Sequence, residues 1–445
     1  MYSSFLLPEL VKGIVDYLSY ENSLCKVLTI NKTWYRISTE ALYRHVNLYP
    51  KNISQFVTAI VGKKDAIKLC EYGELVRCIS LFHFKDIRIS KQISTIANVC
   101  TKISHIRIYY CPGITSETLT KMISKHQDKI HGITMETHEK ISREVLEKIA
   151  SCSHLEELIL KTVGRGPFNN TDLFISIFRQ CTSLRVLDVE HVLFATTNEI
   201  IQTIAEHLKY ISVLRLVTYG ESIIQENVLM SLAQSCVYIT DFYLDGITGI
   251  TDNVMRDLCH KKNCNYFVRR KCNCFGLLEC KTKNKTNNLV HIFLRNVGLK
   301  HPITTQSLLH IAGNCPSLHT LEITGCHLSD LAIQSLVHSC KKIQRLCLGN
   351  EDFLFTDVVL LRIAVELSDI RELTVVNCQL TDESMVSLGQ LCNKLEKLQF
   401  INRRGGGRMM QITDRTIFAF AKSLRSLSYL RLSDCGEILY RNLYI

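Results

Sequence analysis

The sequence lacks the segments that carry a chain into or across a membrane. No run of roughly 18 or more apolar residues occurs, although a bilayer-spanning helix needs about 20. The first residues have no basic segment and reach Pro8 and Glu9 too early for a signal peptide. We therefore expect no membrane partner and place the protein in the cytoplasm, the nucleus or both.

Signatures of catalysis are also missing. The sequence contains no His-Glu-x-x-His and no Gly-x-Ser-x-Gly. Two glycine-rich stretches, 164–166 and 403–408, lack the Lys-Ser/Thr of a phosphate-binding P-loop. We interpret them as loops along one edge of the fold. The sequence thus predicts no enzyme, no catalytic residue and no cofactor.

A short apolar pattern recurs along the chain at a nearly constant spacing. The phrase apolar-x-x-apolar-x-apolar starts at Leu318, Ile343, Ile370 and Leu395, in steps of 25, 27 and 25 residues. A helical apolar run follows each phrase, and Ser/Thr-Asp pairs that suit helix starts precede several of these runs. A strand-then-helix unit of 20–29 residues is typical of leucine-rich repeats. The first anchors of all fourteen phrases are Val76, Ile103, Ile130, Leu155, Leu184, Ile211, Ile239, Cys264, Leu289, Leu318, Ile343, Ile370, Leu395 and Leu427.

Cysteine is frequent, with 20 residues in 445, but its positions indicate packing rather than disulfides. Most cysteines lie either three residues before a strand phrase or eight residues after its first anchor. Free cysteine behaves as a small buried hydrophobe, so we expect reduced thiols. The cysteines at these two positions are Cys100, Cys152, Cys181, Cys236, Cys315, Cys340 and Cys392, and then Cys111, Cys272, Cys326, Cys378 and Cys435.

Residues 7–46 carry a different pattern, which is helical throughout. Leu7-Pro8-Glu9-Leu10 places proline near a first helical turn, and apolar residues follow at helical spacing. Three short helices in about 40 residues bury little surface, and domains this small usually need a metal, disulfides or a partner. The further residues whose spacing defines the pattern are Val11, Ile14, Leu18, Leu24, Val27, Asn31, Lys32, Trp34, Leu42 and Val46.

These residues resemble the F-box family over residues 5–48. In that family the F-box docks on the Skp adaptor of a cullin–RING ubiquitin ligase, and the repeats hold the substrate. The resemblance implies that this chain is the substrate-recognition subunit of such a ligase. The residues that it places against the adaptor are Leu7, Pro8, Leu10, Val11, Ile14, Leu18, Leu24, Val27 and Trp34.

We therefore predict an α/β protein in three parts. Residues 1–48 form an all-α F-box, 49–74 a linker with capping helices, and 75–445 a leucine-rich-repeat horseshoe solenoid of about 13–14 repeats. The repeats resemble the cysteine-rich subtype of the family. In the alternative interpretation the N-terminal helices only cap the solenoid, and the chain is a ligase-independent interaction scaffold.

The least regular unit spans residues 259–288. Its eighth strand phrase, from Cys264 to Cys272, has Arg269 at an apolar anchor. Eight basic residues against one acid lie between 261 and 285, a balance that attracts acidic partners. Few aromatic residues interleave them, so we do not predict nucleic-acid binding. Zinc is not expected because the spacing does not pair ligands as zinc sites do. Its candidate ligands are Cys259, His260, Cys264, Cys272, Cys274 and Cys280.

The alternation of strand residues predicts the binding face. If the anchors point into the core, the third, fifth and seventh residues of each phrase line the concave sheet. In the middle repeats these include Arg215, Tyr243, Arg270, Phe293 and Arg295. Aromatic and arginine side chains dominate binding hot spots, so we predict that a protein substrate binds there. Arginines pair with carboxylates and phosphates, which favours an acidic or phosphorylated substrate segment.

Overall fold

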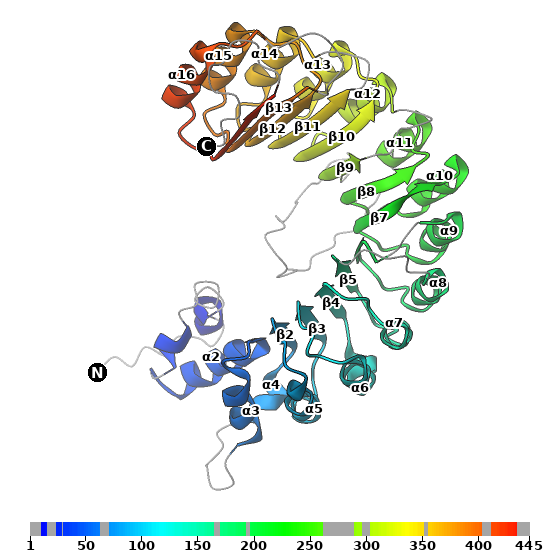
Figure 1. Cartoon of the computed structure of the whole chain (residues 1–445). Helices are drawn as coiled ribbons and strands as arrows, with labels where there is room; N and C mark the ends of the chain where they lie inside the picture. The colour runs from blue at the N-terminus through cyan, green and yellow to red at the C-terminus, as the bar shows by residue number, and fades with distance from the viewer. Residues whose placement is uncertain are drawn as a thin grey trace. The chain divides into compact units, whose positions relative to one another are not determined.

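The computed structural model describes residues 10–15, 24–28, 30–62, 71–163, 170–192, 196–260, 289–295, 303–350, 355–402 and 411–433. The chain falls into two compact units, residues 1–192 and 193–445. In each unit parallel strands lie side by side in chain order, and helices run along one side of the sheet (Figure 1). Among the described residues, no helix has the length and apolar character needed to cross a bilayer.

The first unit begins with helical segments and continues as alternating strands and helices. A short helical stretch covers residues 10–15, and a 3-10 turn, η1, covers Leu24–Val27. The strands are β1 (His45–Leu48), β2 (Cys78–Phe82), β3 (His105–Tyr109), β4 (Gly132–Thr137), β5 (Glu157–Thr162) and β6 (Val186–Glu190). The helices are α2 (Lys32–Arg44), α3 (Ile53–Val61), α4 (Tyr72–Leu75), α5 (Ser90–Val99), α6 (Ser116–His126), α7 (Arg143–Ala150) and α8 (Thr171–Gln180), with 3-10 turns η2 (Ile87–Ile89) and η3 (Gln127–Lys129).

The second unit repeats the same strand–helix alternation. Its strands are β7 (Val213–Ile223), β8 (Asp241–Thr248), β9 (His291–Arg295), β10 (Thr320–Cys326), β11 (Arg345–Asn350), β12 (Glu372–Val376), β13 (Lys397–Ile401) and β14 (Tyr429–Leu432). Its helices are α9 (Asn198–His207), α10 (Glu226–Ser235), α11 (Asp252–Cys259), α12 (Thr305–Asn314), α13 (Asp330–Ser339), α14 (Asp357–Glu366), α15 (Asp382–Leu391) and α16 (Asp414–Ser423).

The leucine-rich-repeat fold is confirmed. Thirteen of the predicted phrases form strands, each beginning two residues after its first anchor. These first anchors are fully buried from Val76 to Leu395, and only Leu427 of the last strand is partly exposed. Equivalent anchors pair across strands, as in Leu321 with Leu346, so the apolar residues form continuous rows between sheet and helices.

The cysteines that precede strands are buried free thiols, as predicted, in the described residues. Their side chains join neighbouring repeats. Cys181 Sγ lies 3.3 Å from the carbonyl oxygen of Cys152, and Cys340 Sγ lies 3.3 Å from that of Cys315. Burial raises the pKa of Cys152, Cys181 and Cys340 to about 12, so these thiols stay protonated at neutral pH.

The described sheet passes directly from the strand of the seventh phrase to the strand of the ninth. Strand β8 pairs directly with β9, with Phe242 opposite Ile292. The helices agree, because Asp252 at the start of α11 accepts hydrogen bonds from the backbone N–H groups of Thr304 (3.0 Å) and Ser307 (3.2 Å) at α12. The predicted eighth phrase, from Cys264 to Cys272, lies outside the described residues, as does the whole of 261–288.

The N-terminal helices continue directly into the sheet. The predicted last helix was expected to run to Val46, but α2 ends at Arg44 and its next four residues form β1. Strand β1 pairs in parallel with β2, His45 opposite Cys78. The repeat sheet thus starts before residue 48, inside the segment assigned to the helical head.

Candidate functional site: one sheet face and a helical head

The predicted binding face is the row of half-buried side chains between the anchors. In β8 and β9 buried and partly exposed residues alternate, with Phe242 and Leu244 inside and Tyr243 facing away from the helices. Strand register places Arg215, Tyr243 and Phe293 side by side across β7, β8 and β9. The alternation of the strand phrase correctly placed these residues on one surface.

These three side chains form a continuous stack. The Arg215 guanidinium lies over the Tyr243 ring at 4.3 Å from its centroid, a favourable cation–π distance. The rings of Tyr243 and Phe293 are tilted by 37° with centroids 5.0 Å apart. Burial raises the pKa of the Tyr243 hydroxyl, so it remains a neutral hydrogen-bonding group. The stack is a rigid, amphipathic ridge that loses little side-chain entropy on binding.

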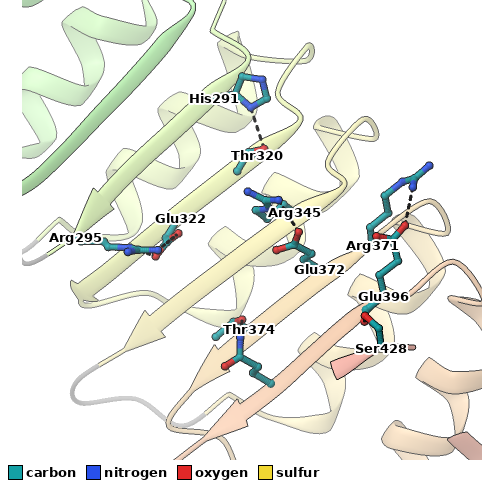
Figure 2. Close-up of polar contacts among 11 residues, drawn as sticks. His291, Arg295, Thr320, Glu322, Arg345, Arg371, Glu372, Thr374, Glu396 and Ser428 are labelled. Carbon is teal, nitrogen blue, oxygen red and sulfur yellow. Dashed lines mark hydrogen bonds and ion pairs between the residues drawn. The ribbon is translucent and has the colours of Figure 1, made fainter. Parts of the chain in front are cut away.

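Arg295 joins this stack but is held by a carboxylate. Its guanidinium lies 6.0 Å from the Tyr243 centroid. Two of its nitrogens donate to Glu322 on β10, with Nη2 at 2.9 Å from Oε2 (Figure 2). This hydrogen bonding raises the pKa of Arg295. Because Glu322 already forms an ion pair with Arg295, an acidic or phosphorylated substrate would have to compete with that carboxylate for the guanidinium. Glu322 is a site residue that the sequence analysis missed, although it is the fifth residue of the Leu318 phrase.

Polar pairs continue along the same face beyond the stack. His291 Nδ1 lies 2.9 Å from the Thr320 hydroxyl, and Arg345 Nη2 lies 2.5 Å from Glu372 Oε1 (Figure 2). Asp241 lies 3.8 Å from His291. Burial raises the pKa of Asp241 and lowers the pKa of His291, which weakens the charge of both groups. The Arg215–Tyr243–Phe293–Arg295 group, which we call the aromatic–arginine patch, is therefore bordered by carboxylates.

The helical head has two faces with opposite environments. Val11 and Val15 are buried against Trp34, and partly buried Val27 and Ile37 pack on the same cluster. On the other side of the 10–15 helix, Leu10 and Ile14 are 56% and 40% exposed. The i, i+4 spacing of the two pairs explains this division.

The predicted adaptor residues are thus divided by the structure. Leu10 and Ile14 lie on the surface, whereas Val11 and Trp34 form the internal core of the head and are not available to a partner. Ile30 and Leu42 are further exposed apolar residues that were not among the predicted adaptor contacts. Leu7, Pro8, Leu18 and the side chain of Leu24 lie outside the described residues, as does Arg270 of the sheet face.

The sequence around Trp34 also explains how the head is built. The Asn31 side chain accepts hydrogen bonds from the backbone N–H groups of Thr33 (2.9 Å) and Trp34 (3.1 Å), so it caps the start of α2. In the first turn of α2 the Tyr35 hydroxyl lies 2.9 Å from that of Tyr72, and near the end of the helix the Tyr43 ring stacks on the Tyr72 ring with centroids 4.7 Å apart. These contacts join α2 to α4, the helix before the first predicted strand.

No group of His, Cys, Asp and Glu suited to a metal occurs among the described residues. Cys259 and His260 are described, but the remaining candidate zinc ligands fall within 261–288 and outside that description. The glycine-rich stretches at 164–166 and 403–408 also lie outside it.

Comparison with known proteins supports the fold. No family model matches the chain. A chain of the crystal structure of the Rad7 and Elc1 complex in yeast is similar over 85% of this chain and 86% of its own length, with a TM-score of 0.51 and 12% sequence identity. An internalin (inlF) from Listeria monocytogenes aligns over 100% of both chains with a TM-score of 0.40 and 14% identity. The first similarity shows a shared fold.

Proposed function

We propose that this protein is a substrate receptor of a Skp–cullin–F-box ubiquitin ligase. The head would bind the Skp-type adaptor and the repeat sheet would bind the target protein. The chain itself would catalyse nothing; it would hold the target near the ubiquitin-loaded partner and so reduce the entropic part of the barrier. We place this activity in the cytoplasm or nucleus.

The observation that carries the proposal is the two-sided helix of the head. A helix of a completed core normally buries its apolar stripe, yet this one exposes Leu10 and Ile14 while Val11 and Val15 already fill the interior. A second apolar face on so small a head fits a partner surface. The resemblance of residues 5–48 to the F-box family implies a Skp-type adaptor as the partner. The fold shared with a chain of the Rad7 and Elc1 complex is compatible with this proposal.

For the target, the aromatic–arginine patch offers apolar area with built-in rigidity. Tyr243 and Phe293 supply the anchors, and Arg215 keeps its guanidinium against the Tyr243 ring. Glu322 and Asp241 border the patch. We therefore propose a protein segment that docks mainly through apolar side chains.

Binding of a purified Skp-type adaptor tests the head directly. Leu10→Asp with Ile14→Asp places charge on the proposed contact, and we expect affinity to fall at least about 30-fold, as for a hot-spot loss. The matched control is Val11→Ala, a neighbour on the internal face, which should lower the melting temperature but retain adaptor binding below it. Unchanged binding by the double variant would count against the proposal.

A second function, the ligase-independent scaffold, is favoured by one observation. The head is continuous with the repeats through β1 and the Tyr43–Tyr72 stack, as expected of a solenoid cap. Under this alternative, complexes purified from cells would contain a target bound to the sheet but no Skp-type adaptor.

A further inference from the structure

The outer helices α13, α14 and α16 expose apolar side chains at positions where α9 and α11 carry polar ones. Of the helices between them, α12 also exposes an apolar residue, Leu309, and Val386 of α15 is half-buried. Leu331 and Phe418 are 76% and 74% exposed. The position of Leu331 in its helix is occupied by exposed Glu199 in α9 and by exposed Asn253 in α11. The apolar residues on α13–α16, which we call the outer stripe, are Leu331, Val358, Leu361, Val365, Val386 and Phe418.

The outer stripe is continuous because the helices that carry it are neighbours. Consecutive helices from α13 to α16 pack against each other (Figure 1). Leu361, Val386 and Phe418 occupy the same helical position in α14, α15 and α16. Contiguous exposed apolar area of this kind marks an interaction site, whereas single exposed residues do not.

The two edges of the outer stripe carry opposite charge. Basic side chains gather toward the helix C-termini, where the acids Glu366 and Asp369 are each paired with them. Acidic side chains gather at the helix N-termini, where Arg415 is an exposed base among the described residues. The basic edge consists of Lys341, Lys342, Arg362, Lys394, Lys422 and Arg425. The acidic edge consists of Asp330, Asp357, Asp382, Glu383 and Asp414.

This arrangement is complementary to itself. A two-fold axis that runs along the stripe, perpendicular to the helices, would set the helices of two copies antiparallel. Each basic edge would then face an acidic edge, and the apolar centres would meet. Four helices of about 15 Å, spaced about 9 Å apart, offer roughly 500 Å² per copy. Pairing would bury on the order of 1,000 Å², which is at the low end for a specific interface.

We propose that the protein forms a two-fold dimer with a second copy of itself through helices α13–α16. The dimer is weak, with dissociation expected in the micromolar range at this interface size. It leaves the sheet face open, because the helices and the aromatic–arginine patch lie on opposite sides of the same sheet. The inference does not depend on the ligase proposal.

Sedimentation of the full chain between about 1 and 100 µM tests the dimer. We expect a concentration-dependent shift from monomer to dimer, and at least a tenfold loss of affinity in Phe418→Asp with Val365→Asp. The control is Ile87→Asp, which changes an equally exposed apolar residue of the first unit and should leave dimerisation unaltered. Because all three side chains are largely exposed, their circular dichroism should match that of the unaltered chain.

A charge-exchange experiment tests the two-fold arrangement. One chain carries Lys342→Glu and Lys422→Glu, the other Glu383→Lys and Asp414→Lys. Each alone should dimerise more weakly because like charges meet, and their equimolar mixture should regain dimer because both edges match again. A monomer at every concentration, an unaffected Phe418→Asp and Val365→Asp variant, or a mixture no better than its components would overturn the proposal. If the stripe binds a different protein instead of a second copy, the purified chain will remain a monomer at every concentration.

Discussion

The two units join their repeats by different side chains at the helix starts. In the second unit each Thr-Asp pair links to the next: the Thr381 backbone N–H and hydroxyl each donate to Asp357 at 2.9 Å, and the buried Ser384 hydroxyl donates to the same carboxylate. In the first unit the corresponding Asp172 pairs with Arg143 across exposed surface.

Aromatic stacking shows the reverse distribution. In the first unit Tyr49, Phe82 and Tyr109 form a stack with centroids 4.9 and 4.8 Å apart along β1, β2 and β3. In the described part of the second unit, Tyr243 and Phe293 form one tilted pair along the strands, and Tyr210 and Tyr238 form a separate stacked pair with centroids 6.1 Å apart. Neighbouring repeats are thus joined mainly by hydrogen-bonded carboxylates in the second unit and by stacked rings in the first. We therefore expect different contacts to limit the stability of each unit.

The largest difference is expected at the helix starts. Asp357→Ala removes the acceptor of three hydrogen bonds and leaves buried donors unpaired, so we expect a loss of about 2–4 kcal/mol in unfolding free energy. Asp172→Ala should cost less than about 1 kcal/mol, since an exposed ion pair contributes little. Denaturant unfolding measures both losses, and hydrogen exchange of the α15 amides reports on Asp357→Ala. Equal effects in the two variants would erase the contrast between the units.

A smaller difference is expected between the aromatic contacts. Phe82→Leu keeps apolar bulk but breaks two ring contacts, for an expected loss of about 1–3 kcal/mol, whereas Phe293→Leu breaks one and should lose about half as much. Thermal unfolding of the two variants provides the comparison. A larger loss in Phe293→Leu would show that the Tyr243 pair is the more important structural contact.

Within the second unit, Glu322 and Glu372 separate buried from exposed pairing. Glu322→Gln weakens a bidentate pair at a nearly buried carboxylate, and we expect a loss of about 1–2 kcal/mol. Glu372→Gln acts on a more exposed pair and should cost under about 1 kcal/mol. Only Glu322→Gln should also strengthen binding of an anionic peptide, because Arg295 is released; fluorescence anisotropy with a phosphopeptide measures this. Identical binding by both variants would exclude Arg295 as a hidden anion site.

The smallest expected effect is on pH dependence. Burial lowers the pKa of His126 in the first unit and of His291 in the second. The unfolded chain therefore binds protons that the folded chain resists, and stability falls as pH drops below about 6.5, the ordinary histidine value, until the folded pKa is passed. His126→Gln and His291→Gln should each flatten this slope, because burial outweighs the group that favours protonation at both sites, the Ala97 backbone at His126 and Asp241 at His291. Thermal melts between pH 5 and 7.5 measure the slopes, and a steeper slope in either variant would contradict this account.

Much of the fold can be predicted from the sequence because each repeat contains its own anchors and helix start within about 25 residues. The anchors, the buried cysteines and most Thr-Asp helix starts were all read correctly, since burial on one side of a strand or helix fixes their period. The eighth phrase, in which Arg269 stands at an anchor, has the weakest pattern. It lies outside the described residues, and β8 pairs with β9, the strand of the next intact phrase.

The candidate site was harder to predict because it depends on contacts between strands. Alternation placed Arg215, Tyr243, Phe293 and Arg295 on one face, but Arg295 appeared as a cation for a ligand until the next strand brought Glu322 against it. In the head, helical spacing placed Val11 and Ile14 on one apolar face of a helix. It could not show which part of that face the rest of the chain covers. That choice depends on Trp34, which follows twenty residues later.

The most direct test of the receptor proposal is quantitative co-purification of adaptor and target with the full chain. Leu10→Asp with Ile14→Asp should lose the adaptor and keep the target, while Tyr243→Ala with Phe293→Ala should lose the target and keep the adaptor. Both partners lost together in either variant, or both retained in each, would contradict a protein that holds them on two separate surfaces.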